Sequence, residues 1–305
     1  MIMKKIKNWM DAFRLRTLPL SLAGIIMGSM LAATYGAFSM EIFFMAVATT
    51  LFLQILSNLA NDFGDSELGT DNAKRVGPVR TLQGGLVTRI EMKIMIAIFI
   101  FLSLISGIAL LLLAYERINT SGLTVMLVVG IISVLAAVFY TIGKRPYGYL
   151  GLGDMFVFIF FGLVSVQGSF FLYTGSYEIN TIIPAVSVGL LSAGVLNLNN
   201  MRDHINDKDS GKHTLVVRIG IKKAKIYHYF LIGTALLSSF IFLAFTQNIF
   251  IGLVFIIPAI PLIINIIKVH NIQDPREFDP ELKKLALATL VFTVGFGTLN
   301  LLPLC

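Results

Sequence analysis

Charged residues are scarce in this chain. They make up 13% of its 305 residues, whereas hydrophobic residues make up 56%. A soluble domain of this length does not need so much apolar surface, so the composition excludes an ordinary soluble protein. Cysteine is almost absent as well. The single cysteine, Cys305, is the last residue, which excludes an intrachain disulfide and a cysteine metal site. The basic residues at 1–7 are not followed by a short apolar core with a small-residue cleavage site, so we expect no removable signal peptide.

Long apolar runs recur along the whole sequence, and each can cross a bilayer as a helix. We predict nine transmembrane helices, at about 18–37, 41–61, 94–114, 122–142, 154–173, 181–200, 226–246, 249–267 and 285–302. Residues 1–17 are predicted to form an amphipathic segment at the membrane interface. The expected fold class is an all-α, polytopic integral membrane protein with one intramembrane domain over 1–305. The loops after the second and sixth helices, 62–93 and 201–225, would form a polar cap on the cytoplasmic side.

The distribution of positive charge predicts the orientation. With the N-terminus in the cytoplasm, every Lys and Arg except Arg117 falls in a cytoplasmic segment. Lys and Arg mark the cytoplasmic loops of membrane proteins. We therefore expect a multi-pass protein of a bacterial cytoplasmic membrane, with the N-terminus inside and the C-terminus outside. The net charge of +7 then reflects topology and not nucleic acid binding.

An acidic motif follows the second apolar run. If the helix continues through it, Asn58, Asp62 and Asp65 share one face, and carboxylates at such a position indicate function. Asn61 and Asp71 add oxygen atoms, and the glycine-rich segment beyond adds Lys74, Arg75, Arg80 and Gln83. Oxygen ligands beside basic side chains are what a diphosphate held by Mg²⁺ requires. The alternative is that these residues only solvate a loop.

A second motif repeats this logic after the sixth run. Asn200, Asp203 and Asp207 share a helical face, with Asn199 just inside the membrane edge and Arg202 and Lys212 nearby. Two such clusters at the ends of two membrane helices predict a shared Mg²⁺ and diphosphate site.

A third cluster joins the fourth and fifth spans. It holds the cations Lys144 and Arg145, tyrosines including Tyr140 and Tyr149, and the carboxylate of Asp154. These groups could position an aromatic, acidic substrate by charge and stacking. An interfacial aromatic belt with positive-inside charge explains part of the same pattern.

These motifs resemble those of the UbiA-type intramembrane aromatic prenyltransferases, over nearly the full length. The family pattern Asn-Asp-x-x-Asp-x-x-x-Asp is met by Asn61, Asp62 and Asp65, and its last Asp is displaced to Asp71. That displacement is typical of the branch that acts on 1,4-dihydroxy-2-naphthoate in menaquinone synthesis. Further matches to the branch are Arg14-x-Arg16-Thr17-Leu18-Pro19, Gly77-Pro78-x-Arg80, Gln83-x-Gly85, Arg145-Pro146-Tyr147-Gly148-Tyr149-x-Gly151-x-Gly153-Asp154, Asn199-Asn200-x-Arg202-Asp203-x-x-x-Asp207 and Gly211-Lys212-x-Thr214.

The resemblance implies transfer of a polyprenyl group from polyprenyl diphosphate to 1,4-dihydroxy-2-naphthoate with loss of CO₂, giving demethylmenaquinol. It implies Mg²⁺ as the cofactor, held by Asp62, Asp65, Asp203 and Asp207, with Asp71 as a further ligand. It also implies that cations stabilise the leaving diphosphate, namely Lys74, Arg75, Arg80, Lys144, Arg145 and Lys212. The lipid bilayer would hold donor and product. Prenyl chain length and oligomeric state do not follow from the resemblance.

Other functions remain open from the residues. Another aromatic acceptor, of the 4-hydroxybenzoate or haem type, would use the same motifs. A secondary transporter would also have many spans with polar residues at depth, but its polar groups would gather near the midplane and not at one face. A membrane scaffold leaves both acidic motifs unexplained.

Overall fold

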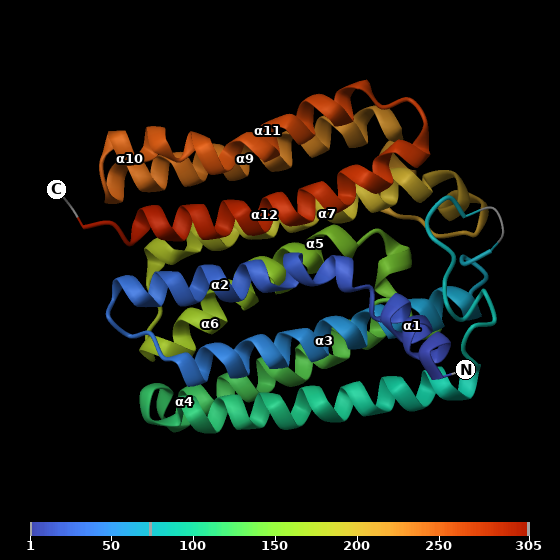
Figure 1. Cartoon of the computed structure of the whole chain (residues 1–305), viewed down its shortest axis with the longest axis horizontal. Coiled ribbons are helices and arrows are strands. Elements are labelled where there is room, and N and C mark those ends of the chain that lie inside the picture. Colours follow the sequence, from blue (N-terminus) through green and yellow to red (C-terminus); the bar gives the residue numbers. More distant parts are fainter. Residues whose placement is uncertain (1, 73–74, 304–305) are drawn as a thin grey trace.

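The structure is a computed structural model that describes residues 2–72 and 75–303. Over these ranges the chain is helical and forms no β-strand. Its long helices lie side by side in one bundle (Figure 1). Eight of the described helices are long and apolar enough to cross a membrane. An all-α membrane fold is therefore confirmed.

The bounds of the elements are as follows. The long ones are α2 (Leu18–Thr34), α3 (Met40–Glu67), α4 (Arg89–Phe139), the continuous run of α5 (Gly153–Val157), η3 (Phe158–Val164) and α6 (Ser165–Thr174), α7 (Ile182–Asp209), α9 (Ile221–Thr246), the pair α10 (Ile249–Val254) and α11 (Ile256–Asn271), and α12 (Phe278–Asn300). The short ones are α1 (Ile2–Phe13), η1 (Leu15–Thr17), η2 (Tyr147–Leu150), η4 (Ile179–Thr181), α8 (Leu215–Ile219) and η5 (Pro275–Glu277).

Helix α4 accounts for two of the predicted spans. A straight helix of 51 residues would be about 77 Å long, more than twice the thickness of the hydrocarbon core. The helix is broken at Asn119, whose φ of 54° and ψ of −176° are not helical. The Asn119 carboxamide oxygen accepts from the backbone N–H groups of Ser121 (3.0 Å) and Gly122 (3.1 Å) and so caps the second leg. The two legs fold back on each other (Figure 1), so this one helix, counted once among the eight, covers two of the nine predicted spans.

The predicted loop boundaries at 62 and 201 are wrong. α3 continues to Glu67 and α7 to Asp209, so residues 62–67 and 201–209 are helical, as are 89–93 and 221–225. The motifs do not end their helices because other segments supply ion-pair and hydrogen-bond partners for most of their carboxylates, as described below. The connecting segments are correspondingly shorter than the sequence suggested.

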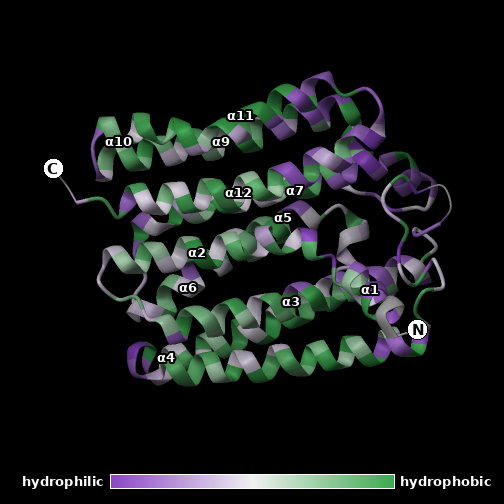
Figure 2. Ribbon diagram, in the orientation of Figure 1, coloured by the Kyte–Doolittle hydropathy of each residue, from purple (hydrophilic) through white to green (hydrophobic). Residues whose placement is uncertain are grey.

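One end of the bundle is polar. It carries α1 and the connecting residues 68–72, 75–88, 140–152 and 210–214, and we call it the polar end. Hydrophilic residues gather there, whereas the middle of the bundle is hydrophobic (Figure 2). The N-terminus lies at the polar end and the C-terminus at the opposite end (Figure 1).

Small residues let the central helices approach closely. α2 packs against α6, and an added Cβ on Gly24 or Gly28 would lie 2.2 Å from Ser165 Oγ or 2.1 Å from Ser169 Oγ. In a membrane, such contacts replace the hydrophobic effect as the source of helix association. α7 is central too, since it contacts α2, α9, α12 and η3. This packing fixes the ends of α3 and α7 that carry the two motifs.

Candidate active site

The first motif lies on the last turns of α3. Asn58, Asp62 and Asp65 are spaced along one helical face, and all three are buried. The Asn58 amide donates to the carbonyl oxygen of Phe13 at 2.9 Å and to the Thr17 hydroxyl at 3.2 Å. These contacts tie the start of the chain to the acidic face.

Asp62 is surrounded by groups from two other segments. Its Oδ2 accepts a hydrogen bond from the Thr81 hydroxyl at 2.7 Å. Its Oδ1 lies 3.7 Å from Arg80 Nε and 3.9 Å from Arg14 Nη2. These three atoms are buried, and none of them has a hydrogen-bond partner. Buried charged atoms without such partners are costly, so a polar ligand would complete this part of the site.

Asp71 follows the helix but belongs to the same group of charges. Its Oδ1 lies 3.2 Å from Arg75 Nε and 3.7 Å from Arg80 Nε, yet neither carboxylate oxygen forms a hydrogen bond. Burial raises the pKa of Asp71 to about 6, against the pull of Arg80. The displaced last aspartate of the motif is therefore placed beside the others.

Asp65 joins the first motif to the segment after α7. Its Oδ1 accepts from the Tyr149 hydroxyl at 2.7 Å and lies 3.3 Å from Lys212 Nζ. The Lys212 ammonium also lies over the Tyr149 ring, 5.0 Å from its centroid. Burial lowers the pKa of Lys212, but the carboxylates of Asp65 and Asp207 outweigh it and hold that pKa above its ordinary value. This lysine therefore stays charged.

The second motif lies on the last turns of α7. Asn200, Asp203 and Asp207 are buried. Arg202 binds Asp203 with two contacts, Nε to Oδ1 at 3.0 Å and Nη2 to Oδ2 at 2.6 Å. No described side chain donates a hydrogen bond to Asp207, which leaves its carboxylate available to a ligand.

Arg75 connects the two motifs directly. Its Nη2 lies 3.3 Å from Oδ2 of Asp203, while its Nε approaches Asp71. The two motifs therefore meet at the polar end and share their cations, as the sequence predicted for a common site.

A cavity of about 560 Å³ extends from this site into the bundle. At its polar end the lining includes Asp65, Arg80 and Lys212. Farther in, the lining is largely apolar, with residues such as Leu111, Met126, Phe161 and Leu172 from α4, η3 and α6. A charged head and an apolar body are the two properties of an amphiphilic ligand with an anionic headgroup.

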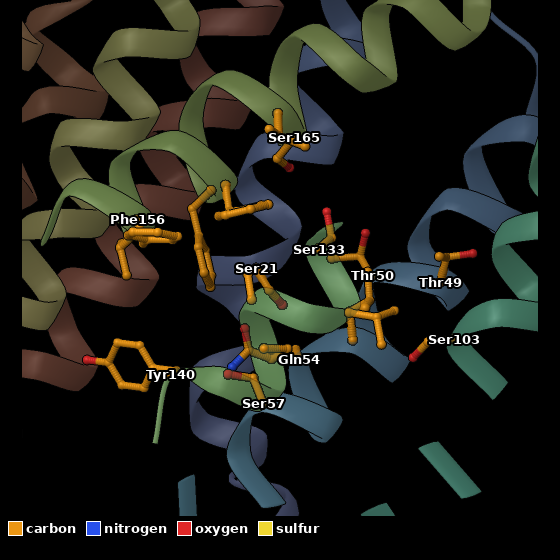
Figure 3. A pocket seen from close by; sticks show the side chains of 18 of the residues that line it. Ser21, Thr49, Thr50, Gln54, Ser57, Ser103, Ser133, Tyr140, Phe156 and Ser165 are labelled. Atoms are coloured by element: carbon orange, nitrogen blue, oxygen red, sulfur yellow. The ribbon is translucent and has the colours of Figure 1, made fainter. Parts of the chain in front are cut away.

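Hydroxyl and amide groups interrupt the apolar wall (Figure 3). They come from α2, α3, both legs of α4 and α6, and include Ser21, Thr49, Thr50, Gln54, Ser57, Ser103, Ser133 and Ser165. Several of these hydroxyls donate to their own helix, for example Ser133 to the carbonyl oxygen of Val129 at 2.8 Å. Such back-bonding satisfies a buried hydroxyl without an external partner.

The sequence-predicted residues divide into three groups by position. Those that line the cavity are Asn58, Asn61, Asp65, Arg80, Tyr140, Asn199, Asn200 and Lys212. Those that lie outside its lining are Arg16, Asp62, Asp71, Arg75, Gln83, Lys144, Arg145, Tyr149, Asp154, Arg202, Asp203 and Asp207. Lys74 lies outside the described residues. Of the second group, Asp62, Asp71, Arg75, Tyr149 and Asp203 still surround the head of the cavity through the contacts given above, and Asp207 acts on Lys212 there by its charge.

Lys144 and Arg145 lie elsewhere. Both are exposed, and with Tyr149 and His213 they line a separate hollow of about 290 Å³ on the surface. Asp154 is buried at the start of α5, and its Oδ1 has no hydrogen-bond partner. The structure thus does not bring these three residues to the cavity.

The sequence did not single out three residues that contact the charged groups. Thr81 binds Asp62, and Arg14 reaches toward it from a left-handed backbone conformation (φ 50°, ψ 55°). A non-glycine residue in that conformation often marks a functional position. Asp279, at the start of α12, pairs with Arg202 and Arg16. Only Arg14 had a local signal, because it belongs to the Arg14-x-Arg16-Thr17-Leu18-Pro19 motif.

The donor set fits Mg²⁺ when a phosphate ligand completes it. Among the described residues, no three acidic, histidine or cysteine side chains stand close enough to form a ready cluster. Mg²⁺ usually takes one or two carboxylates together with water and substrate phosphates, so such a cluster is not required. The buried oxygen atoms without partners on Asp62 and Asp71 are suitable ligands of this kind.

The model of the UbiA prenyltransferase family matches residues 21–298. The chain belongs to this family. A 1,4-dihydroxy-2-naphthoate octaprenyltransferase of Haemophilus influenzae is 39% identical over 300 residues, which cover 97% of this chain and 96% of that protein. A UbiA homologue of Aeropyrum pernix has a similar fold, with a TM-score of 0.68 and 16% identity over 92% of this chain and 97% of that one. Another UbiA homologue, from Archaeoglobus fulgidus and bound to DMAPP and Mg²⁺, aligns with a TM-score of 0.59 and 18% identity over 94% and 98% of the two chains.

Proposed function

We propose that this chain transfers a polyprenyl group from polyprenyl diphosphate to 1,4-dihydroxy-2-naphthoate, with release of diphosphate and CO₂. The observation that carries the proposal is the joining of two acidic motifs at the charged head of a largely apolar cavity. The head has the groups to hold a diphosphate, and the body has the surface to hold an isoprenoid chain. The 39% identity with the Haemophilus influenzae enzyme over nearly the whole chain supports the choice of acceptor.

The charged head would bind the diphosphate through carboxylates and cations together. Asp62, Asp65, Asp71, Asp203 and Asp207 would hold Mg²⁺, which when bound neutralises the diphosphate oxygens and assists their departure. Arg14, Arg80 and Lys212 lie beside these carboxylates and line the cavity. Their fixed positive charge would stabilise the negative charge that grows on the leaving group.

The reaction breaks two bonds and forms one. The carbon–oxygen bond of the donor breaks, and its electron pair leaves with the diphosphate. The electron-rich ring of the acceptor attacks the resulting allylic cation. The new bond forms at the ring carbon that carries the carboxylate. The carboxylate then leaves as CO₂, and its bonding pair restores the aromatic ring. Because CO₂ leaves in place of a proton, no base is needed at that carbon.

Burial of the charged head would protect the allylic cation from water. Asp62 is 1% exposed and Arg80 is 9% exposed, although both lie near the end of the bundle. Residues 75–88 cover Asp62 through the contacts of Thr81 and Arg80 with its carboxylate. A closed head of this kind would keep a reactive allylic cation from hydrolysis.

The polar end would face the cytoplasm of a bacterium, as the charge distribution predicts, with the N-terminus inside and the C-terminus outside. The water-soluble acceptor would then enter from the aqueous side. The isoprenoid donor and the product would remain in the bilayer.

The test is a reaction with purified protein in detergent or liposomes. Polyprenyl diphosphate and Mg²⁺ are supplied with 1,4-dihydroxy-2-naphthoate or with 4-hydroxybenzoate, and products are identified by mass. We expect a prenylated naphthalenediol that has lost the mass of CO₂, together with stoichiometric diphosphate. A product made only from 4-hydroxybenzoate would move the chain to another acceptor class. Absence of diphosphate release with either acceptor would refute prenyl transfer.

A further inference from the structure

Asp279 lies in the first turn of α12, far in sequence from both acidic motifs. Its Oδ1 accepts a hydrogen bond from Nη1 of Arg202, and its Oδ2 lies 3.4 Å from Nη1 of Arg16. The Asp279 side chain is 26% exposed, whereas that of Arg202 is fully buried. α12 thus contributes one carboxylate to the charged groups at the polar end.

Arg202 stands between two carboxylates. Its Nε and Nη2 hold both oxygens of Asp203, and its Nη1 holds Asp279. Nη2 also donates to Asn199 Oδ1 at 2.9 Å. A guanidinium has five N–H donors in a rigid fork, so four of them are committed here. The side chain cannot turn toward one carboxylate without weakening its contact with the other.

This arrangement controls how available Asp203 is. A divalent cation that binds Asp203 must compete with Arg202 for the same two oxygen atoms. Arg75 also approaches Asp203 Oδ2, at 3.3 Å, so Asp203 faces two positive charges. The carboxylate of Asp279, on the far side of Arg202, offsets part of that positive charge. It also gives the guanidinium another partner when a cation binds Asp203.

We propose that Asp279 is a positioning residue of the active site, which holds Arg202 so that Asp203 can bind a divalent cation. It acts through Arg202 and does not itself touch the ligand. This inference rests on the proposed function, because it assumes that Asp203 is a metal ligand. It adds α12 to the elements that determine the properties of the site.

The test measures cation binding separately from catalysis. Purified Asp279→Asn is titrated with Mn²⁺, with and without inorganic diphosphate, and bound Mn²⁺ is followed by electron paramagnetic resonance. We expect the Mn²⁺ dissociation constant to rise at least fivefold, and the KM for polyprenyl diphosphate to rise with it. The kcat at saturating Mg²⁺ should stay within twofold, and Asp279→Glu should restore cation affinity.

The matched control is Asp274→Asn. Asp274 is an acidic residue five positions earlier, caps η5 and is 52% exposed. It contacts Arg276 and no residue of the site, so its variant should bind Mn²⁺ like the native chain.

A second variant is expected to raise Mn²⁺ affinity instead of lowering it, and it provides the test if Asp279→Asn does not fold. Arg16→Gln removes the other cation on Asp279 and leaves that carboxylate to Arg202 alone. Mn²⁺ affinity in the absence of diphosphate should then increase. A decrease with Arg16→Gln, or native Mn²⁺ affinity in Asp279→Asn, would overturn the inference. Prenyl transfer by the native chain is assayed in parallel. The proposed function therefore stands if the native chain is active while these variants bind Mn²⁺ unchanged.

Discussion

Lys212 places its Nζ 3.3 Å from Oδ1 of Asp65, although the two residues are 147 positions apart in the chain. Both side chains are about nine-tenths buried, and the Tyr149 hydroxyl binds the same carboxylate oxygen. This pair joins the segment after α7 to the last turn of α3. It therefore holds together the two halves of the proposed diphosphate site.

The first prediction concerns this pair. Lys212→Met leaves Asp65 buried without its cation, which should lower the free energy of unfolding by about 3–5 kcal/mol. In the double variant Asp65→Asn/Lys212→Met the Asp65 charge is removed together with its cation, so its loss should be smaller than the sum of the two single losses. Denaturation in detergent, followed by circular dichroism, measures all three. Additive losses would show that the two groups do not interact.

The second prediction concerns the carboxylates proposed to bind Mg²⁺. Asp62→Asn and Asp207→Asn keep the size of each side chain but remove its charge. Prenyl transfer should fall by roughly a hundredfold or more, since preorganised electrostatic groups contribute on that scale. Turnover is measured at saturating substrate, with elution volume as the check on folding. Asp11→Asn, on the exposed side of α1, is the control and should remain active. A fully active Asp62→Asn or Asp207→Asn enzyme would remove the basis of the metal–diphosphate proposal.

The third prediction concerns pH. Burial raises the pKa of Asp71 from its ordinary value of 3.8 to about 6, so the native chain holds a proton there that the unfolded chain loses near pH 4. Without a cation, this group should lower the free energy of unfolding as pH rises from about 4 to 6. Mg²⁺ binds only the ionised carboxylate, so its affinity should fall as pH drops below 6, by roughly tenfold per pH unit for each proton released.

Isothermal titration calorimetry with Mg²⁺ and inorganic diphosphate, between pH 5 and 8, measures this dependence. Diphosphate alone is titrated as the reference, since it also takes up protons in this range. Asp71→Asn should flatten the part of the profile that the reference does not explain. An equal pH dependence in the native chain and the variant would exclude Asp71 from metal binding.

Removal of Mg²⁺ with EDTA should abolish turnover of the native chain, and added Mg²⁺ should restore it.

The fourth prediction concerns the body of the cavity. Gly130 lines it on the second leg of α4, and an added Cβ there would meet no atom within 4 Å. Gly130→Leu should therefore fill part of the cavity without disturbing the helices. The ratio of turnover with a long polyprenyl diphosphate to turnover with dimethylallyl diphosphate should fall roughly tenfold.

Gly233→Leu is the matched control for this variant. Gly233 is exposed on α9, also has open space around it and does not line the cavity. Its substitution should leave the ratio unchanged. An unchanged ratio in Gly130→Leu would mean that the prenyl chain runs elsewhere.

The fifth prediction separates two arginines that the sequence treated alike. Arg80 is buried beside Asp62 and Asp71, whereas Arg145 is exposed and lies outside the cavity lining. Arg80→Gln should reduce kcat by at least a hundredfold, since it removes fixed charge near the leaving group. Arg145→Gln should reduce it by less than tenfold. The two variants are compared at saturating substrate, and equal losses would contradict the assignment made from burial.

Much of the fold could be predicted from the sequence, because apolar length and positive charge are direct physical signals in a membrane protein. The membrane-spanning helices followed from these signals, and the shared face of Asn58, Asp62 and Asp65 followed from their helical spacing. The loop boundaries could not be predicted in this way. Hydropathy falls at Asp62 and at Asp203, which suggests that the helices end there, but ion pairs with other segments let both helices continue. Asp279 could not be found from sequence either. Its role depends on Arg202 and Arg16, which only the folded chain brings to it.

The break at Asn119 has a consequence for assembly in the membrane. The chain reverses direction at Asn119, whose side chain caps the second leg of α4. If α4 were straight, every helix after residue 119 would run through the bilayer in the opposite direction. An insertion or deletion that removed this reversal would put the Asp203 motif and the Asp62 motif on opposite leaflets. The meeting of donor and acceptor therefore depends on a hairpin at the end of the bundle remote from the chemistry.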